Sequence, residues 1–288
     1  MSTGITDSMP AGPRVRAEGP SAGTGHANFG RLVASEWTKL RTVRSTIWSF
    51  AALIVVALGL TVLITSLTEA NWSQAKPAQT DSIVVDPVGT IFGAALYLGQ
   101  LAICVLGAMV ATNEYSTGMI RSTLLASPHR VRTLLAKAIA FVIPTVIIGE
   151  IVGFATFEIG SAILKPHAPV SLSDPHVMRA VVGVGLYLGM LGLFALAIGQ
   201  IFRHTAGAIT GTIALVLVLV PISGLLPGSF GKHVAAYLPT NAGQQLLDPV
   251  PTSDPGPLLS AWEGFAVFGV WTALLLAIAA WTLVERDA

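Results

Sequence analysis

Charge is scarce in this chain of 288 residues. Asp, Glu, Lys and Arg make up 11% of it, against roughly 25% in an average soluble domain. Hydrophobic residues make up 53%, and the mean hydropathy is +0.72. This composition excludes an ordinary soluble globule, and it excludes a disordered protein, which combines high charge with few apolar residues. A net charge of +1 also gives no support to a nucleic-acid-binding protein. The composition indicates an integral membrane protein.

Cysteine is nearly absent from the sequence, and a nucleotide-binding motif is entirely absent. The single cysteine, Cys104, excludes an intramolecular disulfide and a metal site built from cysteines. Histidines never fall in a metal-ligand spacing such as H-E-x-x-H, so we expect no metal site. The one Gly-Lys pair, Gly231–Lys232, has no glycine at the spacing that a P-loop needs. We therefore expect no ATP hydrolysis by this chain and, without a cluster of nucleophile, base and metal ligand, no enzyme activity.

Long apolar runs are what the sequence does contain. A helix needs about 20 residues to cross the hydrocarbon core of a membrane. Lipid offers no hydrogen-bond partner to the backbone, so such runs should be helices, and the alternating segments of a β-barrel are absent. Six windows qualify: 47–67, 88–112, 138–164, 180–202, 205–226 and 265–284. The sequence thus predicts an all-α integral membrane protein, with one six-span domain over 29–286 after a disordered tail at 1–28.

Lys and Arg are unevenly distributed about these six windows. Twelve of the 16 lie on the side that carries both termini, and four lie on the other side. The positive-inside rule therefore predicts cytoplasmic termini and a multi-pass protein of the plasma or inner membrane. Close helix packing, mainly within one chain, is expected from small-xxx-small spacings at Gly89/Gly93, Gly149/Gly153, Gly185/Gly189 and Gly207/Gly211.

The segment before the first window has an amphipathic pattern. Apolar residues recur at three- and four-residue steps from Phe29 to Val43, and charged residues, Glu36 included, occupy the remaining face. This predicts a helix in the cytoplasmic headgroup layer. Its candidate functional residues are Trp37, Lys39, Arg41 and Arg44. The helix can be a simple anchor, a brace for the first span or a platform for a cytoplasmic partner, and the pattern does not separate these roles.

Residues 113–137 form the first cytoplasmic loop, which reads NEYSTGMIRSTLLASPHRVRTLLAK. Apolar residues at helical spacing, Leu124 among them, predict a short amphipathic helix that Pro128 ends. Gly118 is expected to let the chain turn as it leaves the second span. Glu114 is expected to pair with basic residues of the same segment, namely Arg121, Arg130 and Arg132. A solvated loop remains the alternative.

Two acidic residues lie inside the third window. Glu150 is near its centre and Glu158 is in its outer third, and no basic residue in a span can pair with them. An ionised carboxylate at mid-membrane costs about 2.5–3.5 kcal/mol on insertion scales. One interpretation makes Glu150 protonated or hydrogen-bonded within the bundle and lets Glu158 reach the outer interface. The other makes them a proton relay or a contact for a cationic substrate, and both stay open.

With these segments the chain resembles the membrane (permease) subunits of type-2 ABC transporters, over about residues 29–286. The similarity consists of EWTKLRTVRST at 36–46, the loop at 113–137, six spans, and AAYLPTNAGQQLL at 235–247 in a long outer loop, 227–262. The resemblance implies an interfacial helix before the first span, a coupling helix that docks on an ATPase, and short helices before the sixth span. Carried over to this sequence, the coupling residues are Glu114, Gly118, Arg121, Leu124, Pro128, Arg130 and Lys137.

The resemblance implies a permease subunit, typically of an exporter. It would form a translocation path with a second membrane subunit, identical or related, and would take energy from separate cytoplasmic ATPase subunits, which would hold ATP and Mg²⁺; this chain would need no cofactor. Two alternatives remain: a proton-coupled secondary carrier that uses Glu150, and a non-transporting anchor or sensor subunit. The sequence does not identify the substrate.

Overall fold

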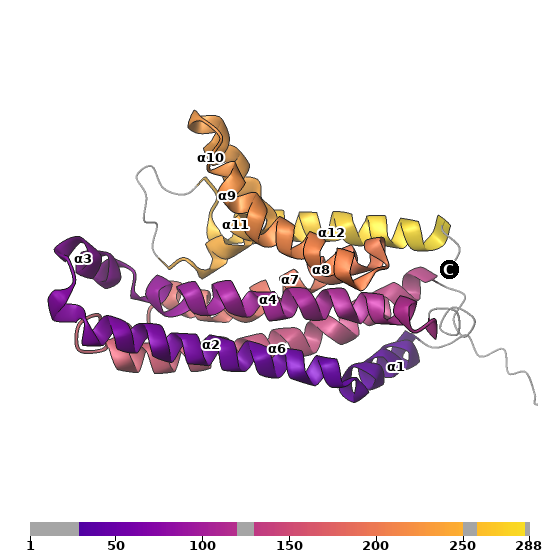
Figure 1. Cartoon of the computed structure of the whole chain (residues 1–288), viewed down its shortest axis with the longest axis horizontal. Coiled ribbons are helices and arrows are strands. Elements are labelled where there is room, and N and C mark those ends of the chain that lie inside the picture. Colours follow the sequence, from indigo (N-terminus) through magenta and orange to yellow (C-terminus); the bar gives the residue numbers. More distant parts are fainter. Residues whose placement is uncertain (1–28, 120–129, 250–257, 286–288) are drawn as a thin grey trace, which may run out of the picture.

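A computed structural model describes residues 29–119, 130–249 and 258–285. Within these ranges the chain forms helices and the turns between them, with no strand (Figure 1). Six helical segments are long and apolar enough to cross a membrane. They are α2 (Arg44–Ala70), α4 (Pro87–Ser116), α6 (Arg130–Leu164), α7 (Pro175–Phe202), the segment from α8 to α9 (Thr205–Ser223) and α12 (Ala261–Glu285). Over the described residues the structure is all-helical, as predicted, and its six candidate spans indicate a multi-pass membrane protein.

The helices extend past most of the predicted windows. α4 continues to Ser116 and α6 starts at Arg130, so much of the predicted loop 113–137 belongs to two helices. Only 117–129 lies between them, and residues 120–129 are outside the described part. The windows were shorter because an apolar run marks only the lipid-crossing part of a helix, and polar turns can continue it into the interface.

The fifth span is irregular. It consists of α8 (Thr205–Ile213), a π-helical turn (η2, Ala214–Val218) and α9 (Leu219–Ser223), which contains Pro221. A proline lacks the N–H that would continue the α-helical hydrogen bonds, and a π-turn is a common response. The span ends at Ser223, just before Gly224 and Pro227. It is thus three residues shorter than the predicted window.

α7 is the central helix of the bundle, and glycines bring its backbone close to its neighbours. A Cβ atom added at Gly149 of α6 would lie 2.8 Å from the Cα of Gly185. One added at Gly107 of α4 would lie 2.6 Å from the carbonyl oxygen of Gly192. Side chains cannot occupy these positions, so α4 and α6 pack on α7 through their backbones. Packing within one chain is thereby confirmed for the Gly149/Gly153 and Gly185/Gly189 pairs.

Short helices complete the fold at both ends. α1 (Phe29–Thr42) packs mainly on α6. η1 (Trp72–Gln74) and α3 (Pro77–Val85) follow α2 and were not predicted. The long loop before α12 holds α10 (Gly228–Tyr237), α11 (Pro239–Gln244) and η3 (Gln245–Leu247). α11 packs on α12 so closely that a Cβ at Gly264 would lie 2.3 Å from the carbonyl oxygen of Ala242.

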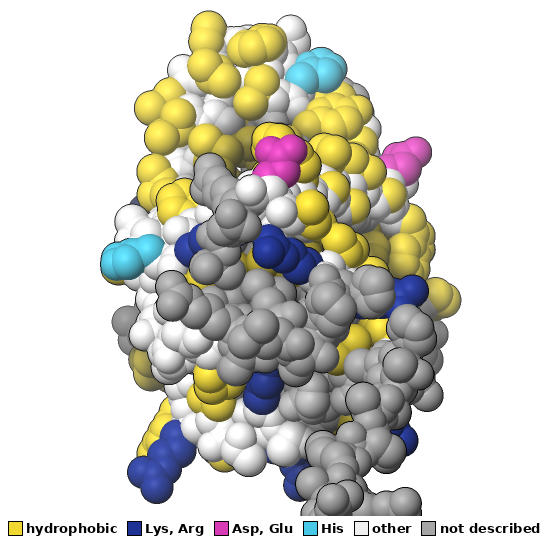
Figure 2. Space-filling view, turned by 90° about the vertical axis from the view of Figure 1, so that its right-hand side faces the viewer, with side chains coloured by type: hydrophobic (Ala, Val, Ile, Leu, Met, Phe, Trp, Pro, Cys, Tyr) yellow, Lys and Arg dark blue, Asp and Glu magenta, His cyan; other side chains and the backbone are white. Residues whose placement is uncertain are grey.

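The two ends of the bundle differ in charge. Eight of the 12 Lys and Arg residues in the described part lie at the end formed by α1, the C-termini of α4, α7 and α12, and the N-terminus of α6, which we call the basic end. Figure 2 looks onto it and shows dark-blue Lys and Arg side chains on this face. The opposite end, with α3 and η3, is called the far end.

Candidate functional site

Four charged side chains meet at the basic end and join three helices. Lys39 of α1 donates to Oε1 of Glu36, one turn earlier, at 2.5 Å and to Oε1 of Glu114 at 2.8 Å. Lys137 of α6 lies 2.6 Å from Oε2 of Glu114 and 4.0 Å from Oε2 of Glu36. We call these four residues the charge cluster. Two acids and two bases leave it with no net charge, and it links α1, α4 and α6.

The charge cluster is withdrawn from solvent. Glu36, Glu114 and Lys137 expose only 4–6% of their surface. Burial by itself lowers the pKa of Lys39, but hydrogen bonds and Coulomb attraction from Glu114 and Glu36 outweigh it and raise this pKa above its usual value. Lys39 is therefore charged at neutral pH, and its contribution to stability is lost only as the pH rises through that raised pKa.

The structure corrects the expected face of α1. Glu36 was placed on the solvent-facing side with the basic residues, yet it lies buried in the charge cluster. Trp37 and Phe29, placed on the apolar face, are each 39% exposed, which agrees with a face turned toward lipid. The helical pattern gave the wrong position for Glu36 because Lys39 of the same helix and Lys137 of α6 compensate its negative charge. Only the tertiary structure brings Lys137 close to Glu36.

The residues of the predicted coupling loop are partly described. Gly118 has φ +70°, a left-handed conformation that glycine adopts without strain, so the predicted turn after α4 is confirmed. The partners that the structure gives Glu114 are Lys39 and Lys137, which the local sequence did not suggest. Arg121, Leu124 and Pro128 lie outside the described residues, as does the predicted coupling helix.

A cavity of about 340 Å³ lies beside the charge cluster. α1 and α4 form most of its wall. Met119, the last described residue before 120–129, also lines the cavity. Val43 and Val110 add apolar surface to the charged side chains. The segment 117–129 thus leaves α4 next to a cavity that is both apolar and charged.

Two arginines at the same end hold the C-terminus of α12. Arg130 donates to the carbonyl oxygens of Leu283 at 2.7 Å and Val284 at 3.3 Å. Arg203 donates to the carbonyl oxygen of Thr282 at 2.9 Å, and its guanidinium lies 5.3 Å from the ring centre of Tyr115. Carbonyls in the last turn of a helix run out of intrahelical donors, and cations near a helix C-terminus interact favourably with its dipole. Sequence reasoning gave Arg203 no role, although it follows directly on a span.

We expect Arg203→Gln to lower the free energy of unfolding by about 1–2 kcal/mol, because it weakens the cap on α12 and the contact with Tyr115. SDS titration of the protein in micelles measures this loss. Arg41→Gln, on the exposed side of α1, is the matched control and should cost less than about 0.5 kcal/mol. Equal losses in the two variants would contradict the capping role.

The two acids of α6 are not brought together. Glu150 lies against Gly185 of α7, and its Oε2 atom is buried without a hydrogen-bond partner in the described part of the chain. Glu158 is exposed. A proton relay that uses both side chains is not supported by this arrangement, whereas Glu150 alone remains a candidate, because a buried carboxylate oxygen without a partner calls for an explanation. The charge cluster and Glu150 lie at different depths of the bundle.

The fold and the site define a class: a helical membrane protein with six candidate spans. Its buried charge cluster links α4 and α6, the helices on either side of the loop 117–129. No protein-family model matches the chain, and no curated protein matches it either. Its function is therefore inferred from its own residues. Among the described residues, no group of three or more His, Cys, Asp or Glu is placed to bind a metal ion.

Proposed function

We propose that the chain is the permease subunit of an ATP-driven transporter of the type-2 ABC class, most simply an exporter. It forms a translocation path with a second membrane subunit, and separate cytoplasmic ATPase subunits power it. The basic end faces the cytoplasm, because Lys and Arg concentrate there. The observation that carries the proposal is the charge cluster, which joins α1, α4 and α6 at the point where the segment 117–129 begins and ends.

The charge cluster suits mechanical coupling. A force on a loop between two helices is transmitted best when the helices at its two ends move together. Here Glu114 near the end of α4 and Lys137 in the third turn of α6 are held by an ion pair of 2.6 Å, and Lys39 adds α1 to the unit. Arg130 continues the linkage to α12. An ATPase that pulls on 117–129 would thus shift several spans together, as alternating access requires.

The energy source must lie outside the chain in this proposal. The sequence has no P-loop, so the ATP and Mg²⁺ would be held by a partner subunit. The conformation of the spans and the state of the ATPase are then coupled across the interface between two polypeptides. This coupling is reciprocal, so an ATPase that moves the spans is also regulated by them. A substrate need not be known to test this, because the ATPase rate of the partner reports the coupling.

We expect Arg121→Glu, or deletion of Ser122–Pro128, to reduce stimulation of a co-purified ATPase subunit at least tenfold while the spans stay folded. Steady-state ATP hydrolysis in nanodiscs measures the effect, and circular dichroism with SDS titration checks the fold. Arg130→Glu is a poor test, because Arg130 also binds the α12 carbonyls. Lys232→Glu, at an exposed position of α10 outside the basic end, serves as a control of equal charge change. Undiminished stimulation in the Arg121 and deletion variants would contradict the coupling assignment.

A second candidate function rests on Glu150. Its buried, unpartnered carboxylate oxygen suits a group that binds and releases a proton, as a proton-coupled carrier needs. Such a carrier would transport with no ATPase. Proton uptake by liposomes that contain the chain alone, abolished in Glu150→Gln, would favour the carrier over the permease.

A further inference from the structure

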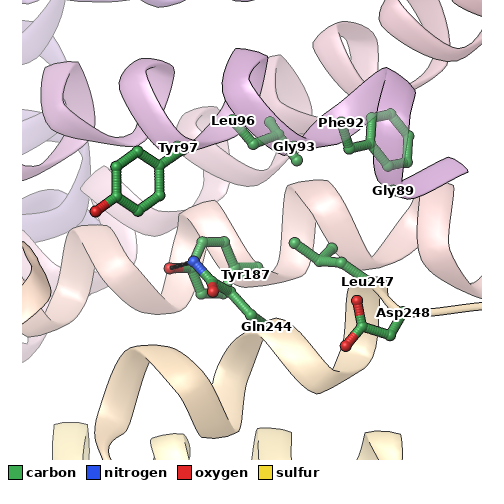
Figure 3. Close-up of a pocket in the computed structure, with 9 residues that line it drawn as sticks. All are labelled: Gly89, Phe92, Gly93, Leu96, Tyr97, Tyr187, Gln244, Leu247 and Asp248. Atoms are coloured by element: carbon green, nitrogen blue, oxygen red, sulfur yellow. Dashed lines mark hydrogen bonds between the residues drawn. The ribbon is translucent and has the colours of Figure 1, made fainter. Parts of the chain in front are cut away.

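A second cavity, of about 390 Å³, opens at the far end. Figure 3 shows it between the first turns of α4 and the η3 segment, with α7 as its back wall. Phe92 and Leu96 project from α4, and Leu247 projects from the opposite wall. Its volume falls in the range of small-molecule sites, roughly 300–1,000 Å³. The charge cluster lies at the other end of the bundle, so this cavity is a separate feature of the fold.

Polar groups in the cavity are fixed by hydrogen bonds. The buried Tyr187 hydroxyl donates to Oε1 of Gln100 at 2.7 Å and accepts from Nε2 of Gln244 at 3.4 Å. This network holds the Tyr187 ring in the back wall. Tyr97, on the opposite side of the opening, is half exposed and adds a second phenol ring. A pre-formed cavity of aromatic and aliphatic side chains with few polar groups suits a ligand with an apolar body.

One end of the cavity carries a carboxylate whose charge is only partly compensated. Asp248 lines it, and Arg179 directs its guanidinium to the backbone carbonyl of Asp248. Asp86, at the start of α4, accepts from the amide of Gly89 and lies near enough to repel the Asp248 carboxylate. Burial first and the charge of Asp86 second raise the pKa of Asp248, and Arg179 offsets them only in part. A cation bound here would relieve this repulsion.

We propose that the far-end cavity binds a small amphiphile with a single positive charge, such as a hydrophobic amine or a quaternary ammonium compound. Its apolar part would lie between Phe92, Leu96 and Leu247, and its cationic group would lie at Asp248, within reach of the aromatic rings. Charge complementarity selects this class: among the described lining residues Asp248 is an acid and none is a base, the neighbouring Arg179 guanidinium is bound to the backbone carbonyl of Asp248, and aromatic rings favour a cation over an anion. The inference goes beyond the proposed function and does not depend on it.

The test compares two probes of the same shape. (Naphthalen-2-ylmethyl)trimethylammonium carries a permanent charge, and 2-neopentylnaphthalene replaces its nitrogen with carbon. Equilibrium dialysis against the full chain in nanodiscs, corrected with empty nanodiscs, measures both. We expect the cation to bind at least tenfold more tightly than the neutral probe. Equal binding of the two probes, or no binding of the cation above empty nanodiscs, overturns the proposal.

Two variants locate the binding. Asp248→Asn keeps the shape and the backbone carbonyl, and it should weaken cation binding about tenfold while the neutral probe is unaffected. Gly93→Leu should abolish the binding of both probes, because a Cβ at Gly93 meets nothing within 4 Å and the longer side chain would fill the cavity. Gly59→Leu in α2, where a Cβ also meets nothing, is the control. Unchanged cation binding in Asp248→Asn or Gly93→Leu overturns the assignment.

Discussion

Glu114→Leu is expected to lower the free energy of unfolding by about 3–5 kcal/mol, the usual cost of removing one partner from a buried ion pair. The substitution leaves Lys137, which is buried, and Lys39 with a single acid, Glu36, between them. Two positive charges then share one carboxylate, and the one on Lys137 lies 4.0 Å from it. SDS titration in micelles measures the loss.

A second variant separates the ion pair from simple packing. In Glu114→Leu/Lys137→Leu the cluster keeps one acid and one base, so we expect the double variant to be more stable than Glu114→Leu alone. Glu158→Leu removes an exposed acid from α6 and should cause no loss. If the loss in the free energy of unfolding in the double variant equalled the sum of the losses in the two single variants, Glu114 and Lys137 would not stabilise each other through an ion pair.

Gly149→Leu is expected to have an effect of similar size, a loss of about 3 kcal/mol or more. A Cβ at this position meets the Cα of Gly185 at 2.8 Å, and a backbone atom cannot rotate away as a side chain can. The two helices must separate, so contacts along their whole seam weaken, which places the cost at or above the usual 1–3 kcal/mol of overpacking. The same unfolding titration reports the change.

Gly59→Leu is the matched control, because it makes the same substitution in a span where a Cβ meets nothing within 4 Å. Leucine has the higher helix propensity, so this variant should be as stable as the parent or slightly more stable. Equal destabilisation by the two substitutions would mean that glycine itself, rather than the close approach of α6 and α7, matters at position 149.

The six spans could be predicted from the sequence because the bilayer imposes a simple requirement. A chain must supply about 20 apolar residues per crossing, and such runs are visible without knowledge of any partner. The glycine spacings of α6 and α7 were informative for a similar reason, since two small residues one turn apart form a face that admits another backbone. Gly93 shows the limit of that reasoning: it has the same spacing, yet it borders a cavity.

The charge cluster could be predicted only in part. Glu114 and Lys137 were singled out, but Glu114 pairs with Lys137, 23 positions later, and with Lys39, 75 positions earlier, and both pairings depend on how the helices pack. Local charge patterns favoured arginines close in sequence instead. Glu36 was assigned to the polar face of α1 because helical periodicity treats every charge as solvent-exposed, and it cannot anticipate that lysines will compensate a buried acid.

The far-end cavity had no signal in the sequence. Its walls come from α4, α7 and the loop before α12, and its carboxylate, Asp248, follows a short 3-10 helix. α3 was missed because nine residues of mixed polarity, in a connection between two spans, carry no clear period. Features that join distant segments thus required the structure, and so did a short helix without an apolar period.

The central claim, that an ATPase subunit grips the segment between α4 and α6, is tested most directly by a photo-crosslinker placed at position 121. The chain is expressed with candidate ATPase subunits, irradiated in native membranes and purified. We expect a crosslinked adduct whose partner contains a P-loop and hydrolyses ATP, with a yield that changes on vanadate trapping, and no such adduct from the same crosslinker at position 59. Crosslinking to lipid or to the chain itself alone, with no nucleotide-hydrolysing partner, would contradict the account.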